Sequence, residues 1–189
     1  MREFLKVVLN HKKNFVPVKV TLSFNQKIQT TVLKILGLKD LNQLRDKYEG
    51  VAFLNKVQAF LFGMQVLETH LGTALIDWNK VLKKDFTGDF SMQSIDARVV
   101  TFKMNEFPVI QSENSSPIVF VLQKNETTGW ICGLAAVETL NNKSNQKLYL
   151  NSKGEFDDNV SFIGFDQLKH FENINELKSL TAKHELSIR

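Results

Sequence analysis

Residues 88–102 read GDFSMQSIDARVVTF, and this stretch decides how the chain is expected to fold. Its second half, residues 95–102, is rich in β-branched and aromatic residues, a composition that predicts a β-strand. Residues two apart in a strand share a face, so Asp96 and Arg98 are expected on the same side of the strand. The intervening Ala97 then points to the other side.

The same stretch brings two carboxylates and a cation into one short segment. Asp89 stands at the start of a hairpin-like segment, and Asp96 and Arg98 follow on the predicted strand. Carboxylates can hold a divalent metal, and an adjacent cation can position the attacking water. This is the arrangement that metal-dependent phosphodiester cleavage needs.

A long amphipathic helix is predicted before this stretch. Its apolar residues are spaced by alternating steps of four and three, which makes one continuous stripe: Phe53, Val57, Phe60, Met64, Leu67 and Leu71. Gly72 is a natural stop for this helix. Glu68 borders the stripe, where a glutamate most often only snorkels at the edge of the core. The functional alternative is a carboxylate that points toward the active edge of the sheet.

The remaining chain predicts several strands followed by helices. Residues 125–129 form a good turn between two of the strands. The expected strands are 118–123, 130–137, 147–150 and 160–163, and the expected helices are 166–171 and 174–180. The order of helix, strands and helix indicates an α/β or α+β fold with a mixed central β-sheet flanked by helices.

Residues 1–50 are expected to form a small N-terminal α/β appendage, and residues 51–189 the main domain. Residues 15–24 alternate apolar and polar side chains, which suggests a short strand with Pro17 at its start or at a sheet edge. A helix ended by Gly37 and a second short helix over 38–48 follow. Gly50 is the most plausible joint.

The composition is that of an ordinary globular protein. The apolar fraction is 43% and the charged fraction 23%, which excludes a disordered chain. The formal net charge of +4 permits a polyanionic partner without demanding one. The single cysteine, Cys132, lies in an apolar run and is expected to be a buried core residue. No apolar run is long enough for a bilayer and no signal-peptide pattern is visible, so a cytoplasmic location and no membrane partner are expected.

The pattern of Glu68, Asp89, Asp96 and Arg98 resembles the PD-(D/E)XK nuclease superfamily, the restriction-endonuclease-like fold. Members often carry an acidic residue on a helix and an aspartate at the start of a hairpin. On the next strand they carry a three-residue motif that consists of an acidic residue, any residue and a lysine. The resemblance covers roughly residues 53–180. It implies that Glu68, Asp89 and Asp96 hold Mg²⁺ or Mn²⁺, that all four residues are catalytic, and that the substrate is DNA.

The chain departs from the family pattern at two positions. Gly88 replaces the proline before Asp89, which the family tolerates. Arg98 occupies the lysine position, and arginine stays charged and cannot act as a base. Arginine can still hold a phosphate bidentately. A slower nuclease, a substitute lysine at Lys103 or Lys84, and a fold that has lost catalysis are all consistent with this change.

Three functions therefore follow as hypotheses. The first is divalent-metal-dependent DNA hydrolysis by an endonuclease-like enzyme in a restriction, repair or phage context. The second is a catalytically inactive protein on the same scaffold that serves as a nucleic-acid-binding or assembly subunit. The third is an unrelated α/β interaction domain in which the motif is accidental. The sequence leaves a homodimer open.

Overall fold

The computed structural model describes residues 2–21, 26, 29, 30, 33, 37–40, 43, 48–76, 95–151 and 154–182, with no side chain described at 48–50, 52 and 53. The described part has mixed α and β content with a mixed sheet and packed helices, which confirms the expected α+β class. No described helix combines the length and the apolarity needed to cross a bilayer.

The central sheet has four strands in the order β1-β5-β4-β2. They are β1 (Val16–Lys19), β5 (Thr128–Ala135), β4 (Ile118–Asn125) and β2 (Arg98–Lys103). β2 and β4 are parallel, so their carboxyl ends meet at the same edge, and the other two pairings are antiparallel. The two-residue turn between β4 and β5 lies at this edge as well.

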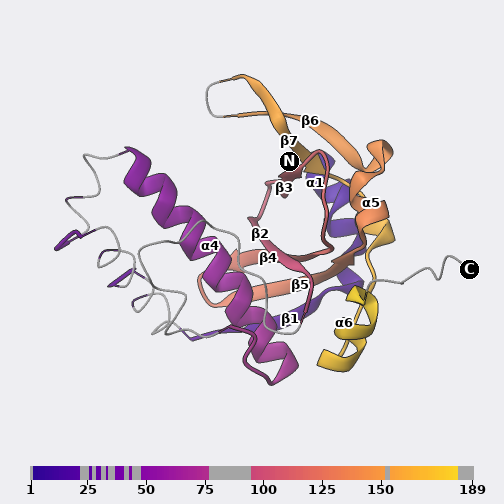
Figure 1. Cartoon of the computed structure of the whole chain (residues 1–189), viewed down its shortest axis with the longest axis horizontal. Helices are drawn as coiled ribbons and strands as arrows, with labels where there is room; N and C mark the ends of the chain where they lie inside the picture. Colours follow the sequence, from indigo (N-terminus) through magenta and orange to yellow (C-terminus); the bar gives the residue numbers. More distant parts are fainter. Residues whose placement is uncertain are drawn as a thin grey trace, which may run out of the picture.

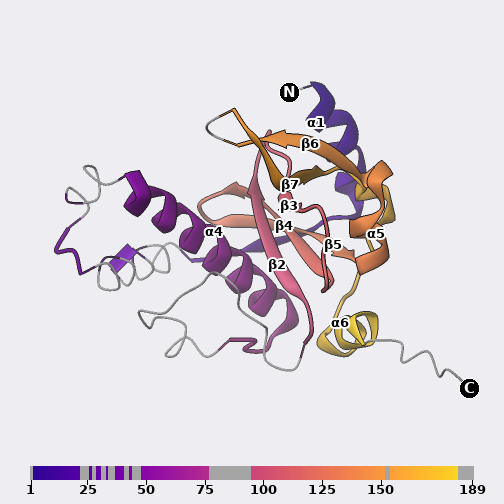
Figure 2. The same cartoon turned by 45° about the horizontal axis from the view of Figure 1, so that its top comes forward.

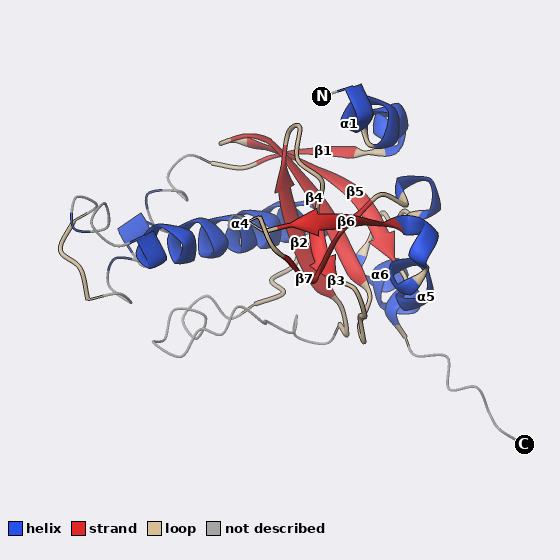
Figure 3. Cartoon of the chain, turned by 90° about the horizontal axis from the view of Figure 1, so that it is seen from above, coloured by secondary structure: helices blue, strands red, loops and turns tan. Residues whose placement is uncertain are grey.

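Helix α4 (Tyr48–Leu71) covers one face of this sheet. Gly63 permits the close approach, because a Cβ there would collide with Thr101 Oγ1 and lie 2.8 Å from Val99 Cγ1. The helix ends as expected, with Gly72 in the left-handed region at φ 63°. Figure 3 shows the amino-terminal end of α4 extending beyond the sheet, away from α5 and α6.

A second sheet and several short helices lie over the other face. The three strands of that sheet pair antiparallel in the order β3-β7-β6. The strands are β3 (Val109–Gln111), β6 (Gln146–Leu150) and β7 (Phe156–Phe162), and the helices are α1 (Arg2–Val7), η1 (Leu9–Asn14), α5 (Val137–Asn141), η2 (Lys143–Asn145) and η3 (Phe165–Gln167). Helix α6 (Ile174–Thr181) lies on the α4 side instead, where Leu177 packs in the same core as α4. In Figures 1 and 2 the β6–β7 hairpin projects beyond the four-stranded sheet.

Two apolar cores lie on the two faces of the central sheet. One is formed mainly by α4 with the residues of β2, β4 and β5 that face it. The other contains a cluster of phenylalanines, in which Phe120 of β4 stacks on Phe162 of β7 with ring centroids 4.8 Å apart. The two sheets are therefore held together through aromatic packing.

The amino-terminal segment contributes a strand to the central sheet and side chains to the phenylalanine core. β1 pairs with β5, with Pro17 opposite Trp130 on the edge strand, as a proline in a strand requires. Phe4, Val8 and Phe15 pack in the phenylalanine core. The described parts of residues 1–50 thus share a sheet and a core with the rest of the chain, and the expected joint at Gly50 falls within α4.

Two of the expected segments differ in the structure. The strand expected over 130–137 ends at Ala135, and α5 begins at Val137. The helix expected over 166–171 is a single 3₁₀ turn, η3, after which Lys169 forms an isolated antiparallel bridge with Leu134. That bridge requires extended backbone, so a tertiary contact overrides the local helical preference.

Candidate functional site

Residues 96–99, which lead into and begin β2, alternate between two faces as the sequence predicts. Ala97 and Val99 are buried in the core under α4, with 3% and 8% of their surface exposed. Asp96 is exposed and Arg98 is half-buried on the opposite side of the strand. The Ser116 hydroxyl donates a hydrogen bond to Asp96 Oδ1 at 3.4 Å, so this carboxylate sits against the loop that leads into β4.

Glu68 organises the turn that follows α4. Its Oε1 accepts hydrogen bonds from the backbone N–H groups of Leu75, at 2.7 Å, and Ile76, at 3.1 Å. α4 covers the Val99 face of β2, whereas Arg98 lies on the opposite face. The structure therefore does not bring Glu68 and Arg98 to the same face of the sheet.

We expect Glu68→Ala to lower the free energy of unfolding by about 1–3 kcal/mol, because two half-buried backbone donors lose their acceptor. Glu68→Gln keeps an acceptor oxygen, so its free energy of unfolding should fall by clearly less. Urea unfolding of both variants checks this. Equal losses in the two variants would contradict a role as acceptor for the turn.

Asp89 lies outside the described residues, as do Gly88 and Lys84. Within the described part of the chain, no three His, Cys, Asp or Glu side chains gather closely enough to share a metal ion. Asp96 and Glu68 alone do not form such a group. Because Asp89 is one of the three expected ligands, the Mg²⁺ or Mn²⁺ site that the family resemblance implies stays a prediction.

Cys132 is fully buried in β5, as expected from its apolar surroundings. Burial raises the pKa of the Cys132 thiol far above its ordinary value, because a thiolate would lose its hydration. The thiol is thus a small core side chain and not a nucleophile.

A polar cavity of about 610 Å³ lies where the carboxyl ends of β2 and β4 face α4. Side-chain alternation explains which strand residues reach it. Val121 and Val99 face the helix, so Gln123 and Lys103, each an even number of positions further along, face it too. Lys103 and Gln123 are direct neighbours in the parallel register of the two strands.

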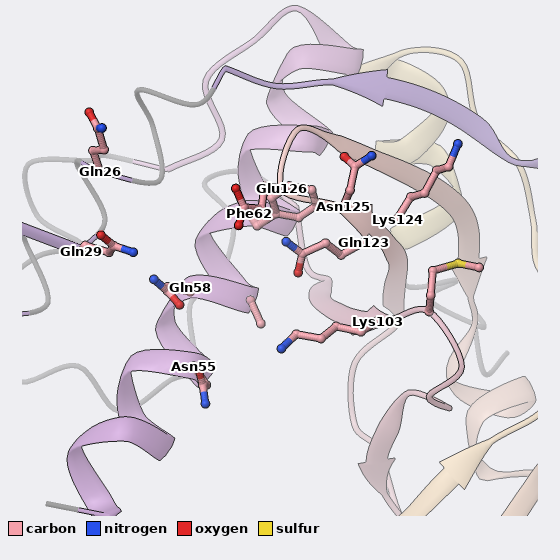
Figure 4. Close-up of a pocket in the computed structure, with 12 residues that line it drawn as sticks. Gln26, Gln29, Asn55, Gln58, Phe62, Lys103, Gln123, Lys124, Asn125 and Glu126 are labelled. Carbon is pink, nitrogen blue, oxygen red and sulfur yellow. The ribbon is translucent and has the colours of Figure 1, made fainter. Parts of the chain in front are cut away.

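Carboxamides make up half of the residues that line this cavity. Figure 4 shows Gln58 and Asn55 of α4 on one side, with Lys103 and Gln123 pointing toward them from the strands. The six amides are Gln26, Gln29, Asn55, Gln58, Gln123 and Asn125. Each amide carries both a donor and an acceptor, so the cavity can match a ligand that offers both.

Charge at this cavity is unevenly distributed. Lys103 projects into it, whereas Lys124 points away from α4 in Figure 4 and lies at the rim. Lys124 Nζ is 5.4 Å from the ring centroid of Trp130, on the far face of the sheet, and Lys12 Nζ lies 4.9 Å from the same ring. Glu126 in the β4–β5 turn adds one carboxylate. Among the described residues at this end of the sheet, lysines therefore outnumber carboxylates.

Comparison of the chain with models of protein families, with curated proteins and with solved structures gives no match. The chemistry of the described side chains is therefore the basis for the function proposed below.

The amide cavity was not found by sequence reasoning. Its residues come from α4, from the end of β2 and from the end of β4, which are far apart in the chain. A local signal does exist on the helix, since Asn55, Gln58, Ala59 and Phe62 recur at the three- and four-residue spacing of one face.

Proposed function

We propose that this protein binds nucleic acid without cleaving it, and that the amide cavity at the carboxyl ends of β2 and β4 is the contact site. The observation that carries the proposal is the pairing of several amides with Lys103 in one cavity. Asparagine and glutamine can read the edges of bases, and lysine can contact a phosphate. The modest positive net charge of +4 is compatible with such a partner.

The form of the cavity favours an unpaired strand. It is a recess between a helix and a sheet end, and not a helix or ribbon that projects into a groove. An unpaired base exposes its whole Watson–Crick edge, which the amides of Gln58 and Gln123 can match from opposite sides. In a duplex that edge is occupied by the partner base. We therefore expect a single strand to bind more tightly than the duplex of the same sequence.

The amides of Gln58 and Gln123 are expected to contribute directly to affinity. Each good amide–base pair is worth about 1–3 kcal/mol, so Gln58→Leu/Gln123→Leu should weaken binding at least about tenfold. The measurement is fluorescence anisotropy with labelled single-stranded DNA and RNA of mixed sequence. Gln111→Leu is the matched control, because Gln111 is an exposed amide on β3, outside the cavity.

Three results would contradict the proposal. One is the absence of binding to any of the oligonucleotides at low salt. Another is an equal loss of affinity in the control and in the double variant. The third is full affinity in the double variant while its fold, monitored by circular dichroism, is unchanged.

Lys103 is expected to contribute a phosphate contact. Lys103→Gln should reduce the slope of log K against log salt concentration by about 0.7, the value for one phosphate contact to a single strand. The measurement is the anisotropy titration repeated between low and physiological salt. Lys56→Gln, on an exposed part of α4 outside the cavity lining, should leave the slope unchanged.

Metal-dependent DNA cleavage on a restriction-endonuclease-like core remains the second candidate function. The observation in its favour is the common outward face of Asp96 and Arg98, which the motif requires. A plasmid-nicking assay with Mg²⁺ or Mn²⁺ distinguishes it from binding alone. Cleavage by the wild type that is lost in Asp96→Asn, with binding retained, would establish the enzyme. No cleavage by the wild type or by Arg98→Lys would favour the binding protein.

A further inference from the structure

The positive charge of the chain is concentrated in one amino-terminal segment. Residues 4–39 contain seven lysines and no aspartate or glutamate. The rest of the chain contains 17 Lys and Arg against 20 Asp and Glu, so its formal net charge is −3. The basic segment supplies η1 and β1 and, with Gln26 and Gln29, part of the lining of the amide cavity. A strongly basic segment therefore leads to the proposed contact site.

Two lysines of this segment lie on the far face of the central sheet, opposite α4. The Lys12 ammonium is 4.9 Å from the ring centroid of Trp130, which belongs to the phenylalanine core on that face. Lys19 pairs with Thr128, which is two positions from Trp130 on β5. Strand alternation therefore places Lys19 on the same face. Both lysines are exposed.

Lys124 connects this face with the amide cavity. It belongs to the cavity lining, and its ammonium lies 5.4 Å from the same Trp130 ring. In Figure 4 its side chain points away from α4. Lys12, Lys19 and Lys124, which we call the lysine face, therefore continue the cavity around the end of the sheet.

Trp130 positions two of the three ammonium groups. Only 7% of its surface is exposed, so its ring does not offer a platform on which a base could stack. The ring instead attracts the cations of Lys12 and Lys124, which lie over it. Side chains that are already positioned lose less freedom when a ligand binds. The lysine face therefore suits phosphates and not bases.

We propose that a single strand bound in the amide cavity continues past Lys124 over the end of the sheet, and that Lys12 and Lys19 hold its next phosphates. This inference rests on the proposed nucleic-acid binding and adds the course of the strand. Phosphate contacts fix the position of a strand but carry no sequence information. The lysine face should therefore accept any base sequence, and the cavity amides should determine any base preference.

The test compares a short and a long single strand of mixed-sequence DNA in anisotropy titrations. Lengths of about 4 and 16 nucleotides span the usual range of single-strand sites, and the short strand is expected to fill the cavity without passing Lys124. Lys12→Gln/Lys19→Gln removes two phosphate contacts. For the long strand, the slope of log K against log salt concentration should fall by about 1.4, and the affinity at low salt at least about tenfold. For the short strand, neither should change.

Two further variants serve as controls. Lys169→Gln/Lys178→Gln removes the same charge from exposed lysines elsewhere. Lys169 pairs with Leu134 near the other end of β5, and Lys178 lies on α6. This variant should bind both strands like the wild type. Lys12→Arg/Lys19→Arg keeps both charges and should keep the wild-type slope.

The results separate the course of the strand from the cavity itself. An unchanged slope for the long strand in Lys12→Gln/Lys19→Gln would overturn the lysine face, as would an equal loss for both strands or in the Lys169 and Lys178 control. Cavity binding would still stand if Gln58→Leu/Gln123→Leu weakened the short strand. Full affinity of that leucine variant for both strands would contradict the cavity as the contact site, and with it the continuous path.

Discussion

Replacement of Phe162 by alanine is expected to lower the free energy of unfolding by about 3–5 kcal/mol, the usual cost of removing a fully buried phenylalanine. Phe162 has no exposed surface and stacks on Phe120 with ring centroids 4.8 Å apart. It also packs on Phe165, with centroids 5.7 Å apart. Because it joins β7 of one sheet to β4 of the other, its loss leaves a cavity between two layers.

The same strand supplies the matched control. Phe156 lies on β7 as well, but 64% of its surface is exposed. Phe156→Ala should change the free energy of unfolding by no more than about 0.5 kcal/mol. Urea unfolding at about 1 μM protein keeps any self-association out of the comparison. Similar losses in the two variants would show that the aromatic layer between the sheets does not carry the stability assigned to it.

Gly133→Val is expected to destabilise the protein by about 2–5 kcal/mol, through a strained backbone and a clash. Gly133 has φ 134°, a conformation that side chains with a Cβ rarely adopt. An added Cβ would lie 2.9 Å from the carbonyl oxygen of Lys169. That oxygen accepts a hydrogen bond from Leu134 N at 2.8 Å and cannot move without breaking the bridge between the two segments.

Gly154→Ala separates the cost of the strained backbone from the cost of the clash. Gly154 also has a positive φ, 76°, but no described atom lies within 4 Å of the position that a Cβ would occupy there. It should therefore show only the conformational cost, about 1–2 kcal/mol. The midpoint of urea unfolding for both variants checks the comparison. A loss in Gly133→Val no larger than in Gly154→Ala would contradict the role given to the Lys169 carbonyl.

The elements that the sequence predicted well are those with strong local signals. α4 has a long apolar stripe and a terminal Gly72 in the left-handed conformation. β4 and β5 are β-branched and aromatic runs separated by a good turn at 126–127. In these segments the hydrophobic period and the turn chemistry favour the same structure, so no tertiary information is needed.

Other elements depend on contacts that no local pattern contains. β3 has only three residues, and its pairing with β7 joins segments about fifty positions apart. The extended backbone at Lys169 exists because Leu134 pairs with it. Short strands and bridges of this kind are determined by the tertiary fold and not by intrinsic propensity.

The candidate site was predictable only in part for the same reason. Alternation along residues 96–99 was enough to place Asp96 and Arg98 on one face. The role of Glu68 was not predictable, because its partners are backbone donors in a turn whose course depends on packing. The amides of Gln58 and Gln123 meet only when α4 lies on the sheet, so their spacing in the sequence carries no sign of a common cavity.

The most direct test of the central claim is to observe the cavity side chains during binding. Two-dimensional NMR of ¹⁵N-labelled protein resolves the side-chain NH₂ groups of asparagine and glutamine, and a short single-stranded oligonucleotide can be titrated in. We predict that the Gln58 and Gln123 side-chain signals shift and saturate with the bound fraction. The amide of Asn145, which is held by the Thr139 carbonyl at 2.9 Å beside α5, should not move. Saturable binding that leaves the Gln58 and Gln123 signals in place would contradict the account.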